Sequence, residues 1–135
     1  MKKVLRIAVL LLFLIPILTG CSSNVDNKIT FRNFASNKIY INFRASVIEV
    51  EAGATTVISE IPQGTFSYET TYEIPAGATS YRTEGAVSGE LSLKAGTEIL
   101  IIYSSTFSDG LYTLGATIST SEDLSGSGGS DPLNP

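Results

Sequence analysis

The sequence has 135 residues and a formal net charge of −4, with one cysteine and no histidine. The lack of histidine excludes a Ser-His-Asp or Cys-His catalytic pair and an imidazole metal site, and the single cysteine excludes an internal disulfide. We therefore expect no metal or other cofactor, and an acidic chain without a basic stripe predicts no nucleic-acid partner.

The first twenty residues are typical of a secretory signal peptide. A basic start over residues 1–6 precedes an apolar run over residues 7–18. As a helix, this run reaches about 18 Å, whereas the hydrocarbon core of a membrane is about 30 Å thick. The pattern therefore predicts a signal helix within a signal peptide at residues 1–20, and not a membrane span.

The tetrad Leu18-Thr19-Gly20-Cys21 follows the apolar run at once. It resembles a bacterial lipobox, in which a large aliphatic residue, two small residues and a cysteine end the apolar run. The resemblance implies that the Cys21 thiol receives a diacylglyceryl group and that signal peptidase II cleaves between Gly20 and Cys21. Cys21 would then become an N-acylated first residue. The alternatives are an ordinary signal peptide and a buried free cysteine.

The anchor predicts where the protein resides. Two or three acyl chains give effectively permanent attachment, because each buried methylene contributes about 0.8 kcal/mol. We expect a lipid-anchored protein of the bacterial cell envelope, held in the membrane through Cys21. In Gram-negative lipoproteins the residue after the cysteine influences sorting, and Ser22 in place of aspartate favours the outer membrane.

The mature chain is predicted to hold one domain between two polar segments. Residues 21–27 comprise the lipidated cysteine and a short tether. Residues 120–135 contain a Ser-Gly-Ser-Gly-Gly-Ser run and almost no large apolar side chain, which predicts a disordered tail. The domain itself is expected over residues 28–119.

Residues 28–119 contain runs of Val, Ile, Thr, Tyr and Phe between Gly and Pro turns, and none of them is predicted to be helical. Ile39, Ile41 and Phe43 alternate with Tyr40, Asn42 and Arg44, as in a strand with one buried face. The same alternation involves Phe66, Tyr68, Thr70 and Tyr72, then Val87, Leu91 and Leu93, then Tyr112, Leu114, Ala116 and Ile118. Residues 99–103 are apolar on both faces and are expected in mid-sheet, covered on both sides. The pattern predicts an all-β fold, a two-sheet antiparallel sandwich of about seven or eight strands.

Three stretches resemble known families. The strand with Arg32-Asn33 and Ala35-Ser36, and the turn Ala95-Gly96-Thr97 before an apolar strand, resemble a bacterial envelope family of unknown function. Residues 61–66 resemble the turn of carboxypeptidase-regulatory-like sandwiches. These resemblances imply an immunoglobulin-like or prealbumin-like sandwich and supply no catalytic residue. The segment over residues 73–90 departs from both patterns.

Acidic side chains are the first candidate site residues: Glu49, Glu51, Glu69, Glu73 and Asp109. They form no Asp-x-Asp-x-Asp-Gly run of the kind that binds calcium. Glu49 and Glu51 share one parity, which is typical of a solvent-facing strand. We therefore expect no metal or catalytic carboxylate pair here.

Tyrosines are the second candidates, because exposed tyrosines bind sugars and proteins. Tyr40 is predicted to be an exposed binding residue, since Ile39 and Ile41 occupy the core face. Tyr68 and Tyr72 are expected in the core.

The absence of a catalytic motif predicts a non-catalytic binding or structural module of the envelope, and not an enzyme. Its expected partner is an envelope protein or a glycan, and an exposed strand edge could receive a partner strand. The alternative is a ligand-binding domain, for example for a glycan, or a hydrolytic domain that uses a cleft lined by tyrosine and glutamate.

Overall fold

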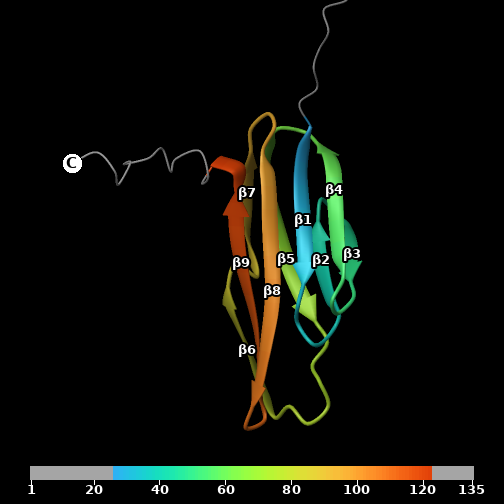
Figure 1. Cartoon of the computed structure of the whole chain (residues 1–135), viewed down its shortest axis with the longest axis vertical. Coiled ribbons are helices and arrows are strands. Elements are labelled where there is room, and N and C mark those ends of the chain that lie inside the picture. The colour runs from blue at the N-terminus through green and yellow to red at the C-terminus, as the bar shows by residue number, and fades with distance from the viewer. Residues whose placement is uncertain (1–25, 123–135) are drawn as a thin grey trace, which may run out of the picture.

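The computed structural model describes residues 26–122, which form nine strands in two facing sheets (Figure 1). The strands are β1 (Asn27–Asn33), β2 (Ile39–Phe43), β3 (Ser46–Val50), β4 (Thr55–Ile61), β5 (Gly64–Tyr72), β6 (Ser80–Gly85), β7 (Ser88–Leu93), β8 (Glu98–Ser108) and β9 (Leu111–Thr120). One sheet has the order β4-β1-β8-β9-β6 and the other has the order β3-β2-β5-β7. The predicted all-β two-sheet sandwich is confirmed.

Two details of that prediction were wrong. The sandwich has nine strands, and two pairs in the five-stranded sheet, β1 with β8 and β6 with β9, are parallel. Turn residues indicate antiparallel pairing only between strands that follow each other in the chain. The partners in both parallel pairs are separated in the chain by other strands, so no turn motif reports their direction.

Strand β6 lies in the segment over residues 73–90, which departs from both family patterns. All six of its residues are exposed, so it has no buried parity to detect. At its end Gly85 has a φ of 72°, and a Cβ atom there would collide with the carbonyl oxygen of Ala116. This glycine lets the chain leave the five-stranded sheet and continue as β7 in the other sheet.

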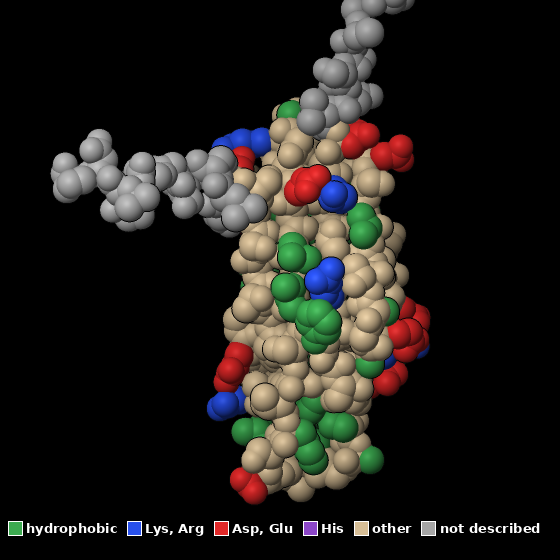
Figure 2. Space-filling model, viewed as in Figure 1, with side chains coloured by type: hydrophobic (Ala, Val, Ile, Leu, Met, Phe, Trp, Pro, Cys, Tyr) green, Lys and Arg blue, Asp and Glu red, His purple; other side chains and the backbone are tan. Residues whose placement is uncertain are grey.

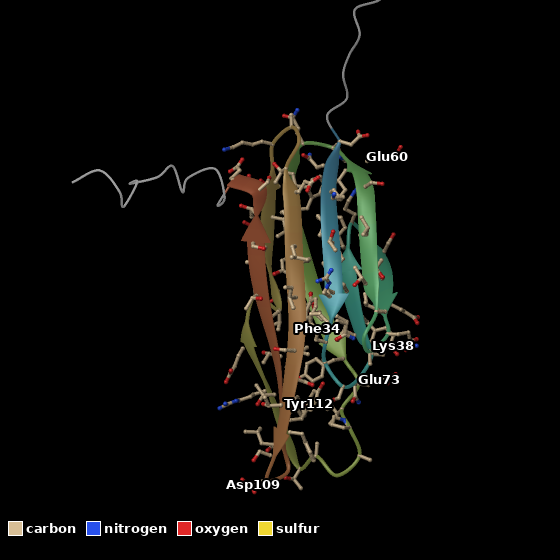
Figure 3. All side chains as sticks on the ribbon, in the orientation of Figure 1. Phe34, Lys38, Glu60, Glu73, Asp109 and Tyr112 are labelled. Carbon is tan, nitrogen blue, oxygen red and sulfur yellow. The ribbon has the colours of Figure 1, made fainter. Side chains whose placement is uncertain are left out.

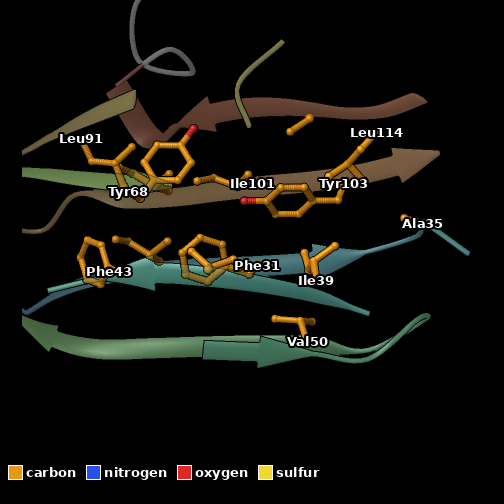
Figure 4. Close-up of a cluster of buried hydrophobic side chains, with 14 of the residues drawn as sticks. Phe31, Ala35, Ile39, Phe43, Val50, Tyr68, Leu91, Ile101, Tyr103 and Leu114 are labelled. Carbon is orange, nitrogen blue, oxygen red and sulfur yellow. The ribbon is translucent and has the colours of Figure 1, made fainter. Parts of the chain in front are cut away.

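The core lies between the sheets and contains most of the side chains that alternation predicted (Figure 4). Phe66, Tyr72 and Val87 are only partly buried, and the prediction was wrong for Ile118, which is 40% exposed near the end of β9. Ile39, Ile41 and Phe43 are buried, whereas Asn42 and Arg44 are exposed. Strand β8 lies in mid-sheet, as expected from residues 99–103. Its outer side chains are only half-buried, however, so the prediction that both faces are covered was wrong.

Two buried asparagine side chains stabilise the ends of β1. At the start, Asn27 donates to the Ile61 carbonyl over 3.0 Å and accepts from the Thr97 N–H over 2.8 Å. At the end, Asn33 donates to the carbonyls of Asn37 (2.9 Å) and Val50 (3.0 Å) and accepts from the Ala35 N–H (2.9 Å). Because Val50 belongs to the other sheet, Asn33 links the two layers.

Two buried tyrosine hydroxyls differ in their hydrogen bonding. Tyr103 and Thr70 share a hydrogen bond of 2.7 Å between their hydroxyl oxygens inside the core. The hydroxyl of Tyr112 is also buried, yet it has no hydrogen-bond partner among residues 26–122. A buried polar group without a partner costs about 1–3 kcal/mol.

This difference predicts opposite effects of removing each hydroxyl. We expect Tyr112→Phe to stabilise the domain by up to about 1 kcal/mol, because it removes an unsatisfied group. We expect Tyr103→Phe to destabilise it by about 1–2 kcal/mol, because the buried Thr70 hydroxyl loses its partner. Urea unfolding of both variants measures the difference, and equal effects would contradict the contrast.

The core tyrosines also predict weakening in alkali. Burial raises the pKa of Tyr103 and of Tyr68 above the usual value near 10. Above about pH 10 the folded chain therefore retains phenol protons that the unfolded chain loses. The contribution of these protonated hydroxyls to the free energy of unfolding is complete below about pH 10 and is lost as pH rises further. The free energy of unfolding, measured by urea titration, should be lower at about pH 11 than at about pH 8. We expect this difference to be smaller in Tyr103→Phe than in the wild type.

Candidate functional site

A groove lies on the outer face of the four-stranded sheet, where β5 extends past the end of β2. It has a volume of about 620 Å³. Besides Ala45, Phe66 and Tyr68, its lining consists of polar side chains from β2, the turn after it, β5 and β7, and they are Asn42, Arg44, Thr65, Ser67, Glu69 and Ser88. We call these six residues, together with the ring of Phe66 that adjoins them, the polar groove.

Strand register creates the polar groove. Asn42 lies opposite Glu69, and Glu69 lies opposite Ser88, so the three side chains form one row across β2, β5 and β7. The pairing of β2 with β5 ends where Phe43 meets Tyr68. Beyond that point β5 continues without a β2 neighbour, and this step in the sheet forms one side of the groove.

Arg44 follows β2 in a strained turn. Arg44 and Ala45 both have a left-handed backbone, with φ of 50° and 58°, and together they connect β2 to β3. Two-residue hairpins of this kind usually contain Asn-Gly or Asp-Gly. The guanidinium of Arg44 lies 5.6 Å from the ring centroid of Phe66, within the range of a cation-π contact.

The strain at this turn predicts a stabilising substitution. Ala45→Gly should raise the free energy of unfolding by about 0.5–1 kcal/mol. The left-handed conformation costs an alanine about 1–2 kcal/mol, which glycine avoids, but the greater chain entropy of glycine in the unfolded state offsets part of this gain. Ala52→Gly, in an exposed turn without a positive φ, is the matched control and should destabilise. A fall in the urea midpoint of Ala45→Gly would contradict the prediction.

A charged cluster lies further along the same face, around Tyr40. The Tyr40 hydroxyl donates to Glu73 Oε1 over 2.8 Å, and Lys38 Nζ lies 5.9 Å from the Tyr40 ring centroid. Lys38 also pairs with Glu51 at 2.6 Å and Glu49 at 3.4 Å. The hydrogen bond to Glu73 raises the pKa of Tyr40, and the bonds to Glu51 and then Glu49 raise the pKa of Lys38.

Tyr40 therefore lies on the outer face, half-buried, with its hydroxyl already bonded. Figure 3 places Lys38 and Glu73 near each other at the same end of the sheet. Because the side chains of this cluster bind one another, a ligand would have to break existing contacts there. The binding role of Tyr40 stays a prediction.

The other candidate residues are dispersed. Glu49 and Glu51 are exposed, as expected of a solvent-facing strand. Glu69 belongs to the polar groove, whereas Glu73 bonds to Tyr40 and Asp109 lies in the turn between β8 and β9, at the far end of the domain (Figure 3). Between Asp26 and Glu122, no three acidic, histidine or cysteine side chains form a group that could hold a metal ion.

The remaining tyrosines pack inside or at the edge of the sandwich. Tyr68 is buried, as predicted, and donates to the Ala86 carbonyl over 2.6 Å. Tyr72 is half-buried, and its ring centroid lies 5.7 Å from that of Tyr112 and 6.5 Å from that of Tyr81. Tyr68 also lines the groove of about 620 Å³ that contains Glu69, although the two residues belong to opposite faces of β5.

The outer face of the five-stranded sheet has a different character. Hydrophobic side chains gather around a basic side chain in the middle of this face (Figure 2). Phe34 and Val57 are 60% and 54% exposed, and the guanidinium of Arg32 lies 5.8 Å from the Phe34 ring centroid. A smaller groove of about 340 Å³ lies on the same face, where Lys28 and Glu98 form an ion pair of 2.9 Å.

The predicted anchor concerns residues that lie outside the described part of the chain. These are the signal helix, Gly20 and Cys21, together with most of the 21–27 tether and residues 123–135 of the tail. At the domain boundaries, β1 begins at Asn27 and β9 ends at Thr120. Over residues 26–122, no helix has the length and apolar character required to cross a membrane.

Sequence reasoning missed Arg44, Ser67 and Ser88 as members of one site. Parity along β2 did predict that Asn42 and Arg44 point outward, but the register between strands brings them to β5 and β7. Comparisons with protein-family models and with curated proteins find no match to this chain.

Proposed function

We propose that this protein is a lipid-anchored protein of the bacterial cell envelope whose β-sandwich is a non-catalytic binding module. The anchor is supported by the order of basic start, apolar run and Leu18-Thr19-Gly20-Cys21 in the sequence. The polar groove is the proposed binding surface, and its partner is an envelope protein or a glycan.

The observation that carries the binding role is the unpaired state of the polar groove. Four of the six basic side chains over residues 26–122 form ion pairs with carboxylates, and these are Lys28, Lys38, Arg82 and Lys94. The other two, Arg32 and Arg44, form none, and neither does the Glu69 carboxylate in the groove. The side chains of Arg44 and Glu69 also make no hydrogen bond within the described chain. Their hydrogen-bonding capacity is therefore available to a ligand.

The lining of the polar groove supports binding in preference to hydrolysis. Glycoside hydrolysis usually requires two carboxyl groups that flank the scissile bond. Among the described residues that line this groove, Glu69 is the only carboxylate. A single carboxylate beside Arg44 and hydroxyl groups is suited to holding a ligand by hydrogen bonds.

Site-specific photo-crosslinking in intact cells tests this proposal. A benzophenone amino acid replaces Asn42 in the polar groove or, as a control, Thr117 on the outer face of the other sheet; both positions are exposed. We expect an adduct of higher mass only from position 42, and we expect it to weaken in Cys21→Ser, which lacks the proposed anchor. Equal adducts from both positions, or none from position 42 in anchored protein, would overturn it.

A further inference from the structure

We propose that the polar groove binds a neutral oligosaccharide through the hydroxyl groups of its sugars, an inference that rests on the proposed binding function. The groove offers the N–H donors of Arg44, the acceptor oxygens of Glu69, and the Asn42 amide and three hydroxyls, which both donate and accept. Its one positive and one negative side chain leave no net charge. A hydroxyl-rich, uncharged ligand matches such a surface, because each sugar hydroxyl also donates and accepts.

The row across the sheet places these groups within reach of one ligand. Directly opposed residues on neighbouring strands have Cβ atoms about 4.5–5.5 Å apart. Glu69 therefore lies between Asn42 and Ser88. Its carboxylate only accepts hydrogen bonds, whereas the amide of Asn42 and the hydroxyl of Ser88 both donate and accept them. The volume of about 620 Å³ falls within the range of about 300–1,000 Å³ that is typical of small-ligand sites.

Arg44 is positioned before any ligand arrives. Its backbone is set by the left-handed turn, and its guanidinium lies over the Phe66 ring. Contact with the aromatic ring restricts the motion of the guanidinium at the groove, which lowers the ordering cost on binding.

An extended peptide is the competing ligand, because β5 has an unpaired edge on its β2 side over residues 64–67. Strand addition depends on a run of main-chain hydrogen bonds along such an edge. This edge is only a few residues long, and the Arg44 side chain lies beside it, over Phe66. An added strand would have to displace Arg44, whereas a sugar can use it, so the contacts favour the oligosaccharide.

Binding of defined probes to the full-length protein in a zwitterionic detergent tests the inference. The probes are chitohexaose, cellohexaose and maltohexaose, with a Val-Thr alternating hexapeptide as the strand probe, each titrated by calorimetry. We expect at least one oligosaccharide to bind, and Arg44→Ala and Glu69→Ala each to weaken it about tenfold or more. Asp109→Asn removes one negative charge at the far end, keeps a side chain that tolerates the φ of 51°, and should leave affinity unchanged.

Three results would overturn the oligosaccharide proposal. They are no binding of any of the three sugars, sugar binding that Arg44→Ala and Glu69→Ala do not weaken, and preferential binding of the peptide that Arg44→Ala strengthens. If the crosslinker at position 42 still captures a partner in cells, the binding function stands and only its ligand class is wrong. If it captures nothing there, the proposed function itself fails.

Discussion

Cys21→Ser is expected to abolish membrane attachment and leave an unprocessed precursor. Lipid transfer requires the thiol, and in the lipobox resemblance cleavage follows lipidation, so serine blocks both steps. The energetic effect is large, because two or three acyl chains contribute about 0.8 kcal/mol for every methylene they bury. Metabolic labelling with an alkyne fatty acid, with intact mass and carbonate extraction of membranes, measures the loss.

Ser23→Ala is the matched control for this prediction. It removes a hydroxyl two residues after the cysteine and leaves the tetrad intact, so labelling and mass shift should remain as in the wild type. If Cys21→Ser retains the fatty-acid label and the mature mass, Cys21 is not the lipidated residue. Cleavage of the wild type without any attached lipid would favour an ordinary signal peptide.

Asn33→Ala is expected to destabilise the domain by about 3–4 kcal/mol. The side chain of Asn33 is fully buried and makes three hydrogen bonds, to Asn37, Val50 and Ala35. Alanine leaves these three main-chain groups without their hydrogen-bond partner. Each unsatisfied buried group costs about 1–3 kcal/mol, and the cost is smaller where water can enter. The free energy of unfolding from urea titration provides the measurement.

Two further variants separate the hydrogen bonds from the volume of the side chain. Asn33→Asp keeps the shape but cannot donate to the two carbonyls when ionised, so it should also lose several kcal/mol. Asn42→Ala, at an exposed position of β2 without internal bonds, should change stability by less than about 0.5 kcal/mol. A loss below about 1 kcal/mol in Asn33→Ala would show that the amide does not hold the two sheets together.

The sandwich was predictable where burial alternates along a single strand. Ile39, Ile41 and Phe43 carry their parity in the sequence, because every second side chain of a strand points to the same face. Strand β6 has no such parity, since all its residues are exposed at the sheet edge. Parallel pairing of β1 with β8 depends on contacts between strands distant in sequence, which no local pattern encodes.

The candidate site was predictable only in part, for a related reason. Tyr40 points outward because its neighbours are buried, and this follows from β2 alone. The polar groove depends on where β2 stops relative to β5, and on a left-handed turn that contains neither glycine nor asparagine. Two-residue hairpins usually contain Asn-Gly, so the sequence Arg44-Ala45 does not predict the turn that positions the guanidinium.

Amide chemical-shift mapping tests the proposed binding surface most directly. Spectra of ¹⁵N-labelled protein are recorded before and after addition of solubilised envelope material from the native cells. We expect changes concentrated at Asn42, Arg44, Ser67 and Glu69 and at their neighbours on β2, β5 and β7. Changes confined to the outer face of the five-stranded sheet, or no change at saturating ligand, would contradict binding at the polar groove.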